Sequence, residues 1–321
     1  MPKIKQNSIK KDVYSPPVII TSGSTYLDID AYACAAAMAE LLNIQGIYAI
    51  AFSQAPCNYS VCSSLVKEGQ VVRELPSDFD GNSAKYIIVD VSDPEFLKDS
   101  VPLDQVTEIY DHHSGFENYW TSRIGEDAHI EFIGAAATLI HREWKVAGLQ
   151  NKMSCSTARL LMAAILDNTL DLTSSNTTDE DREAFSELCR HAGEDNSFRA
   201  SYFSEVQLNV ESDLKNALFK DMKHIGQTPL LPDNMAQLCV WNAEGIFEKL
   251  SHIREWFGVM NGGWLLNLID IKHRCSYFVC DDRYYQDVIE KIFAVEFEDG
   301  VARSADPYLR KQIIKNVLNS R

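Results

Sequence analysis

The stretch Val106-Thr-Glu-Ile-Tyr-Asp-His-His113 decides the fold class, because a run of strand-forming residues ends in it on an aspartate and two histidines. Lys85-Tyr-Ile-Ile-Val-Asp90 closes in the same way, and Tyr26-Leu-Asp-Ile-Asp30 carries two aspartates after another short apolar run. Runs of β-branched and aromatic residues of this length predict buried strands. Since ligand sites in open α/β sheets form at the carboxyl ends of the strands, we expect these acids and imidazoles to gather at one edge.

The predicted elements alternate between strand and helix, which favours a parallel sheet. Strands are expected at residues 17–21, 46–52, 85–90 and 106–111, and helices at 30–42, 134–148, 154–166 and 178–192. The polar stretch from Arg190 to Ser197 is the best linker candidate. After it we expect a helix at 201–222, strands at 236–241, 264–271 and 276–280, and helices at 283–295 and 308–319. The fold class is therefore predicted to be α/β, with a first domain at 1–192, a linker at 193–200 and a smaller α/β domain at 201–321.

Four acidic positions could complete a metal site around the two histidines. A single aspartate after a strand usually caps a helix or forms a turn. Several carboxylates at one sheet edge would repel one another unless cations lay among them. Oxygen-rich sites with one or two imidazoles suit Mg²⁺, Mn²⁺ or Co²⁺. We therefore interpret the set as a two-metal hydrolytic centre, built from Asp28, Asp30, Asp90, His112 and Asp167.

Further motifs make the chain similar to a known family, the DHH phosphoesterases, from about Ile19 to about Leu318. The segment from Asp167 to Asp181 and the small-residue stretch from Gly134 to Ile140 resemble the manganese-dependent inorganic pyrophosphatases of this family. Leu309-Arg-Lys-Gln-Ile313 and Phe219-Lys-Asp-Met-Lys223 resemble motifs of the second domain in those pyrophosphatases and in the cytosolic exopolyphosphatases. The resemblance implies a metal-binding catalytic domain, a DHH-associated substrate-binding domain, and an active site in the cleft between them.

The same resemblance implies a role for each matching residue. Asp28 and Asp90 would hold one metal, and Asp30, Asp90, His112 and Asp167 the other, with Asp90 bridging. His113 would contact the substrate phosphate, and three cations would approach from the second domain: Lys223, Arg310 and Lys311. Without the resemblance, an Arg-Lys pair in a C-terminal segment would be a solvated helix end.

The chain departs from the family pattern at three positions. Ser24 stands where the pyrophosphatases carry a histidine ligand, and a hydroxyl is a poorer ligand than an imidazole. Exopolyphosphatases also lack that histidine, so Ser24 favours the exopolyphosphatase subgroup. Leu309 replaces the usual serine before Arg-Lys, and Lys315 lies near a position where proline is common. Both changes affect the region expected to bind the substrate.

Composition limits the substrates that the protein can bind and the cellular compartment in which it is expected. The chain of 321 residues has a formal net charge of −16 and no Lys/Arg-rich run with interleaved aromatics, which disfavours long nucleic acid as a substrate. No apolar run approaches the roughly 20 residues of a membrane span, and the first residues lack a signal core. The eight cysteines form no Cys-x-x-Cys pair, as in proteins of a reducing compartment. We expect a cytoplasmic protein that acts on a small polyanionic phosphate and does not bind a membrane.

Three functional hypotheses follow. The first is a metal-dependent phosphoanhydride hydrolase that releases orthophosphate from inorganic polyphosphate, as exopolyphosphatases do. The alternative is a manganese-dependent inorganic pyrophosphatase. The third is a short-nucleotide phosphodiesterase or a weakly active regulatory relative. The Arg-Lys motif of the second domain disfavours the phosphodiesterase, and Ser24 favours the regulatory relative. The sequence leaves open the preferred substrate length and whether the chain is a monomer or a homodimer.

Overall fold

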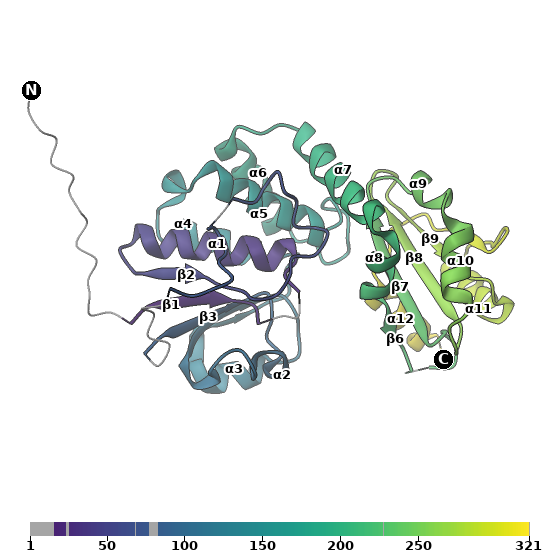
Figure 1. The fold of residues 1–321 in the computed structure, drawn as a ribbon, viewed down its shortest axis with the longest axis horizontal. Coiled ribbons are helices and arrows are strands. Elements are labelled where there is room, and N and C mark those ends of the chain that lie inside the picture. Colours follow the sequence, from purple (N-terminus) through teal and green to yellow (C-terminus); the bar gives the residue numbers. More distant parts are fainter. Residues whose placement is uncertain (1–15, 24–25, 68, 77–82, 227, 321) are drawn as a thin grey trace, which may run out of the picture. The chain divides into compact units, whose positions relative to one another are not determined.

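The computed structural model describes residues 16–23, 26–67, 69–76, 83–226 and 228–320. The chain forms two compact units (Figure 1). Unit 1 consists of Met1–Asn168 and Asn176–Glu194, and unit 2 of Thr169–Ser175 and Asp195–Arg321. The segment Thr169–Ser175 thus groups with unit 2, whereas the sequence placed it inside the first domain.

Unit 1 is built on a parallel sheet, as the alternating pattern predicted. Its strands run in the order β2-β1-β3-β4-β5, and every neighbouring pair is parallel. From β1 the chain adds β2 on one side of the sheet and then returns to add β3 on the other side. The gap between β1 and β3 is therefore the topological switch point, where α/β sheets bind ligands. The strands are β1 (Val18–Thr21), β2 (Ala49–Ala51), β3 (Lys85–Val89), β4 (Val106–Asp111) and β5 (Ala128–Ile130).

Helices cover both faces of this sheet (Figure 1). On one face lie α1 (Ile29–Ile44), α4 (Ala136–Val146), α5 (Cys155–Asn168) and α6 (Asp179–Ala192), and on the other α2 (Pro94–Leu97) and α3 (Glu117–Ile124). Single turns of 3₁₀-helix occur at Leu103–Gln105, Gly125–Asp127 and Gln150–Lys152. The alanines of α1 are buried, so their small side chains allow α4 and α5 to approach α1 closely.

Unit 2 contains a mixed sheet in the order β10-β9-β8-β7-β6. β7 and β8 are parallel and the other pairs are antiparallel. The strands are β6 (Lys223–His224), β7 (Asn234–Val240), β8 (Trp264–Asp270), β9 (Cys275–Val279) and β10 (Val301–Arg303). The helices are α7 (Ser197–Ser212), α8 (Leu214–Asp221), α9 (Glu244–Phe247), α10 (Leu250–Gly258), α11 (Arg283–Phe293) and α12 (Arg310–Asn319). The central strand β8 is buried along its whole length. Side chains of α11 and α12 pack with it in a hydrophobic core of unit 2.

The structure differs from the sequence prediction in several elements. The helix expected at 201–222 is two helices, because Asp213 leaves helical geometry with φ −143°. Helix α7 begins at Ser197, inside the segment expected to be a linker. The short edge strands β5, β6 and β10 were not predicted, since two or three residues carry no readable periodicity. Within the described residues, no helix has the length and apolarity needed to span a membrane.

Candidate metal centre

Asp90 follows β3 and turns its backbone at the switch point of unit 1. Its φ is +57°, in the left-handed region that aspartate tolerates better than most residues. Its N–H donates to the carbonyl of Tyr110 at 2.8 Å, which links the ends of β3 and β4. Backbone strain of this kind is often found at functional sites. The turn places the Asp90 carboxylate beside the two histidines that follow β4.

His112 has one ring nitrogen tethered and the other turned toward the acids. Its Nδ1 lies 3.3 Å from the carbonyl oxygen of Ile133, and a carbonyl can only accept, so Nδ1 carries the hydrogen. In the neutral ring Nε2 then carries the lone pair, and it lies 3.3 Å from Asp90 Oδ1 and 4.0 Å from Asp30 Oδ2. A backbone carbonyl on the second ring nitrogen is a frequent partner of metal-binding histidines.

The two aspartates of the first motif differ in their surroundings. Asp28 caps α1, accepting a hydrogen bond from the Ala31 N–H at 3.0 Å. Asp30 is fully buried, and its Oδ2 and Oδ1 accept from the N–H groups of Ala136 at 2.9 Å and Ala137 at 2.8 Å. The first turn of α4 therefore fixes the Asp30 carboxylate in one orientation. Oδ2 keeps a further lone pair for a ligand, whereas Oδ1 also accepts a long bond of 3.4 Å from the Cys34 thiol.

Asp111 organises the histidine pair. Its Oδ1 accepts from the N–H groups of His112 at 2.7 Å and His113 at 3.1 Å, and it lies 2.8 Å from His113 Nδ1. Desolvation alone would lower the pKa of His113, but the hydrogen bond to Asp111 and the charge of Asp90 raise it. Nδ1 is thus held by Asp111, and Nε2 is left for a ligand. About 58% of the His113 side chain is exposed.

The charges around Asp90 indicate whether these residues suit a metal ion. Burial, followed by the charges of Asp28 and Asp30, holds the pKa of Asp90 well above its usual range. Asp90 Oδ1 and His112 Nε2 are both buried without a hydrogen-bond partner among the described residues. Ligand atoms of Asp90, His112 and His113 lie within 4.8 Å of one another. Crowded carboxylates and an unpartnered imidazole nitrogen fit a divalent cation, which would neutralise the repulsion and accept the lone pairs.

The remaining predicted residues fall in different parts of the chain. Asp167 lies one residue before the end of α5 in unit 1 and is half-buried. Ser24 lies outside the described residues. Lys223, at the start of β6, and Lys311, in the first turn of α12, are exposed in unit 2. The structure thus brings Asp28, Asp30, Asp90, His112 and His113 to one edge of the sheet.

Arg310 is engaged within unit 2. Its Nη1 donates to Asp221 Oδ2 at 2.6 Å, to the Asp221 carbonyl at 2.7 Å and to the Met235 carbonyl at 3.1 Å, while Nη2 donates to Asp221 Oδ1 at 3.1 Å. Gln237 extends the network, because its N–H donates to Asp221 and its side-chain oxygen accepts from the Arg310 N–H. This forked ion pair joins the end of α8, strand β7 and the start of α12.

Sequence reasoning did not assign two features of the centre. Asp111 was part of the opening motif but received no role, although it positions both histidines. The N–H groups of Ala136 and Ala137 hold Asp30, and the only sequence signal for them was the small-residue stretch before α4. Backbone donors leave no residue-type pattern, which explains why they were missed.

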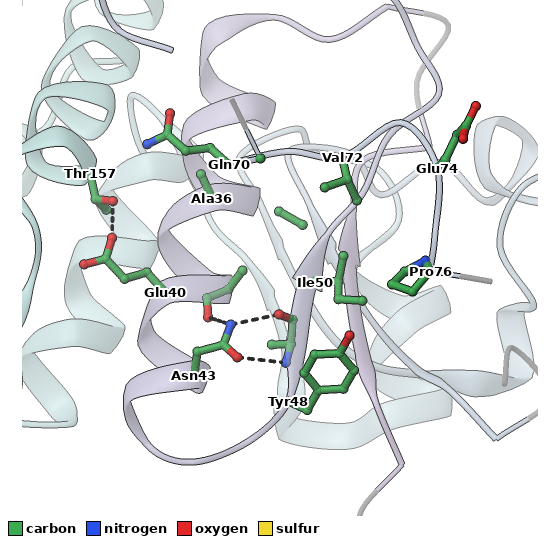
Figure 2. Close-up of a pocket in the computed structure, with 14 residues that line it drawn as sticks. Ala36, Glu40, Asn43, Tyr48, Ile50, Gln70, Val72, Glu74, Pro76 and Thr157 are labelled. Atoms are coloured by element: carbon green, nitrogen blue, oxygen red, sulfur yellow. Dashed lines mark hydrogen bonds between the residues drawn. The ribbon is translucent and has the colours of Figure 1, made fainter. Parts of the chain in front are cut away.

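A separate cavity lies along the C-terminal half of α1, away from Asp30 at its first turn (Figure 2). Its volume is about 400 Å³, and α1, β2, the segment 69–76 and Thr157 line it. Some of the polar side chains that Figure 2 shows are already bonded: Glu40 accepts from Thr157, and Asn43 bridges the backbone of Ala39 and Ala49. None of the predicted site residues lines this cavity, so the metal centre is distinct from it.

Comparisons with known proteins agree with the resemblance. No family model matches the chain. A manganese-dependent inorganic pyrophosphatase of Methanothrix thermoacetophila is 29% identical over 150 residues, 44% of this chain and 43% of the relative. The match to that relative thus spans less than half of its length. A probable manganese-dependent inorganic pyrophosphatase of Deinococcus radiodurans is 23% identical over 300 residues, 89% of this chain and 93% of the relative.

Solved structures share the fold. A putative family II inorganic pyrophosphatase of Methanococcus jannaschii matches with a TM-score of 0.64 at 17% identity, covering 94% of this chain and 98% of its own. An exopolyphosphatase-related protein of Bacteroides fragilis matches with a TM-score of 0.51 at 12% identity, covering 95% of this chain and 91% of its own. The predicted fold class and the resemblance to this group of proteins are confirmed.

Proposed function

We propose that the chain is a metal-dependent hydrolase of phosphoanhydride bonds that releases orthophosphate from inorganic polyphosphate. The pairing of Asp90 Oδ1 with His112 Nε2 carries this proposal: the two atoms are buried, 3.3 Å apart and without a hydrogen-bond partner among the described residues. Two lone pairs directed at each other are unfavourable unless a cation or a proton lies between them. The match to a probable manganese-dependent inorganic pyrophosphatase, which covers 89% of this chain, supports a cation.

The proposed ligands divide between two divalent cations, Mn²⁺ or Mg²⁺, with Co²⁺ as an alternative. Asp28 and Asp90 would hold one ion, and Asp30, Asp90, His112 and Asp167 the other. When bound, such a pair supplies a water of lowered pKa and polarises the phosphoryl group. Residues 1–192 would then act as the catalytic domain and 201–321 as the substrate-binding domain.

The side chains of this protein have their own tasks in the reaction. His113, tethered through Nδ1 to Asp111, would direct Nε2 to a phosphoryl oxygen and donate a hydrogen bond as charge develops there. Lys223 and Lys311, which are exposed, would bind the transferred and leaving phosphates as point charges. Arg310 would contribute the part of its guanidinium that Asp221 and the carbonyls leave free.

The choice between polyphosphate and pyrophosphate rests on Ser24. A site without the histidine ligand is expected to hold the first metal more weakly, and exopolyphosphatases share that lack. Pyrophosphate is the alternative substrate, because the curated relatives are named for it. The formal net charge of −16 disfavours long nucleic acid as a substrate.

Orthophosphate release by the metal-stripped protein, resupplied with Mn²⁺ or Mg²⁺, tests the proposal. Pyrophosphate, tripolyphosphate, long-chain polyphosphate and a dinucleotide are compared at equal concentration of scissile bonds. Asp90→Asn is the matched control, since it keeps the size of the side chain and removes its charge. We expect fastest release from the polyphosphates, dependence on the metal, and loss of release in Asp90→Asn.

Each other result selects a different function. Fastest release from pyrophosphate would make the chain a pyrophosphatase, and cleavage of the dinucleotide alone would make it a phosphodiesterase. A wild-type protein that binds Mn²⁺ but hydrolyses none of the substrates would be a regulatory relative. Equal turnover of wild type and Asp90→Asn would remove the metal centre from the reaction.

A further inference from the structure

The orientation of Asp30 depends on the loop that leads into α4. Both carboxylate oxygens are held by the first N–H groups of that helix, on Ala136 and Ala137. Its other contacts among the described residues are longer: the Cys34 thiol donates to Oδ1 at 3.4 Å, and His112 Nε2 lies 4.0 Å from Oδ2. A displacement of residues 134–138 would therefore rotate the Asp30 carboxylate.

Asp181 binds the same loop through two hydrogen bonds. Its Oδ2 accepts from the Gly134 N–H at 2.9 Å, and its Oδ1 accepts from the Thr138 hydroxyl at 2.6 Å. Asp181, like Thr138, is fully buried, so water cannot replace either bond. The two bonds hold the residues that flank Ala136 and Ala137.

The segment before Asp181 completes the attachment. Asn176 Nδ2 donates to the Gly134 carbonyl at 3.3 Å, so both sides of Gly134 are bound by residues 176–181. Asp181 Oδ2 also accepts from the N–H and hydroxyl of Thr178, each at 2.7 Å, which closes the capping box of α6. Asp181 thus has two separable functions: it caps its own helix, and it holds the loop that binds Asp30.

We infer that Asp181 is a positioning residue of the metal centre, acting on Asp30 through the peptide groups at the start of α4. The inference rests on the proposed metal centre. A capping aspartate needs only the bonds to Thr178, whereas the bonds to Gly134 and Thr138 reach another helix more than 40 residues away, at sequence separations of 47 and 43. Outer-shell partners of metal ligands affect affinity because they fix the direction of the ligand lone pair.

Four proteins separate the two functions of Asp181: the wild type, Asp181→Ala, Thr138→Val and Thr178→Val. Asp181→Ala removes every bond, and Thr138→Val removes one bond to the loop while keeping the shape of the side chain. Thr178→Val is the matched control, since it weakens the α6 cap and leaves the bonds to Gly134 and Thr138 in place. Isothermal titration of Mn²⁺ into each metal-stripped protein gives its affinity, and circular dichroism verifies its fold.

We expect Asp181→Ala to weaken Mn²⁺ binding about tenfold, the lower end of outer-shell effects. Thr138→Val should weaken it about threefold, because it removes only one of the bonds to the loop. Thr178→Val should lower the melting temperature and leave the affinity unchanged. Hydrogen exchange of the metal-free proteins, measured on peptides covering 133–139, should be faster in Asp181→Ala than in Thr178→Val. If Asp181→Ala does not fold, Thr138→Val decides the question.

Two outcomes would overturn the inference while leaving the metal centre in place. One is a folded Asp181→Ala or Thr138→Val that binds Mn²⁺ as tightly as the wild type. The other is an equal loss of affinity in Thr178→Val, which would mean that the cap alone is responsible. A wild-type protein that binds no Mn²⁺ would instead refute the proposed function, and it is recognised by the first titration.

Discussion

Replacing Arg310 by alanine is expected to destabilise unit 2, because the guanidinium is bound inside it. The side chain donates four hydrogen bonds, to both carboxylate oxygens and the carbonyl of Asp221 and to the carbonyl of Met235. Arg310 is 9% exposed, and its truncation would leave the Met235 carbonyl without this donor. Lys311, the next residue, is exposed and provides a matched comparison.

The magnitude follows from the burial of the two partners. Removing one partner of a buried ion pair costs roughly 3–5 kcal/mol. The Asp221 side chain is 34% exposed, so water compensates part of its charge, and about 3 kcal/mol is expected. Lys311→Ala should change the free energy of unfolding by less than about 0.5 kcal/mol, as exposed substitutions do.

Urea unfolding followed by tryptophan fluorescence provides the assay. Trp241, Trp256 and Trp264 belong to unit 2, and Trp120 and Trp144 to unit 1, so Trp→Phe backgrounds report each unit separately. Asp221→Ala and the double variant with Arg310→Ala complete a double-mutant cycle. We expect a coupling energy above about 1.5 kcal/mol, which is within the range for contacting residues.

A stability loss under about 1 kcal/mol in Arg310→Ala, or additive effects in the cycle, would refute the structural role of the ion pair. Normal stability with impaired phosphate release would instead assign Arg310 to substrate binding alone. Loss of stability together with impaired release is the expected combination, since α12 also carries Lys311.

Three further predictions concern unit 1. Asp90→Asn should reduce metal-dependent phosphate release by at least about 100-fold with an unchanged circular dichroism spectrum, because the charge proposed to bind both metals is lost; turnover within tenfold of the wild type would contradict the two-metal assignment. Ser24→His should raise the Mn²⁺ affinity measured by titration, since imidazole is the stronger ligand, and equal affinities would remove Ser24 from the metal site. Burial lowers the pKa of His141 despite the nearby Glu187. The unfolded chain therefore binds a proton more readily, and stability should fall as the pH drops below the ordinary value of 6.5, by up to about 1.4 kcal/mol per pH unit. His141→Gln should show a shallower fall in urea midpoint between pH 7 and pH 5, and parallel curves for the two proteins would exclude His141 as the cause.

The sequence by itself determined the parallel sheet of unit 1 and the neighbourhood of Asp90 and His112. Strand-length apolar runs are local patterns, and the rule that parallel strands present their carboxyl ends at one edge converts them into a three-dimensional expectation. Helices were also predicted at 134–148, 154–166 and 178–192. The structure has them at Ala136–Val146, Cys155–Asn168 and Asp179–Ala192.

Only the tertiary structure decided how the polar side chains are engaged. Asp30 meets the N–H groups of Ala136 and Ala137 at sequence separations of 106 and 107, and Arg310 meets Asp221 at a separation of 89. Such partners share no periodicity, and backbone donors have no residue type to read. A carboxylate meets such donors only after the chain has folded. The sequence therefore indicates which polar residues are candidates for a site, and the fold determines what each of them binds.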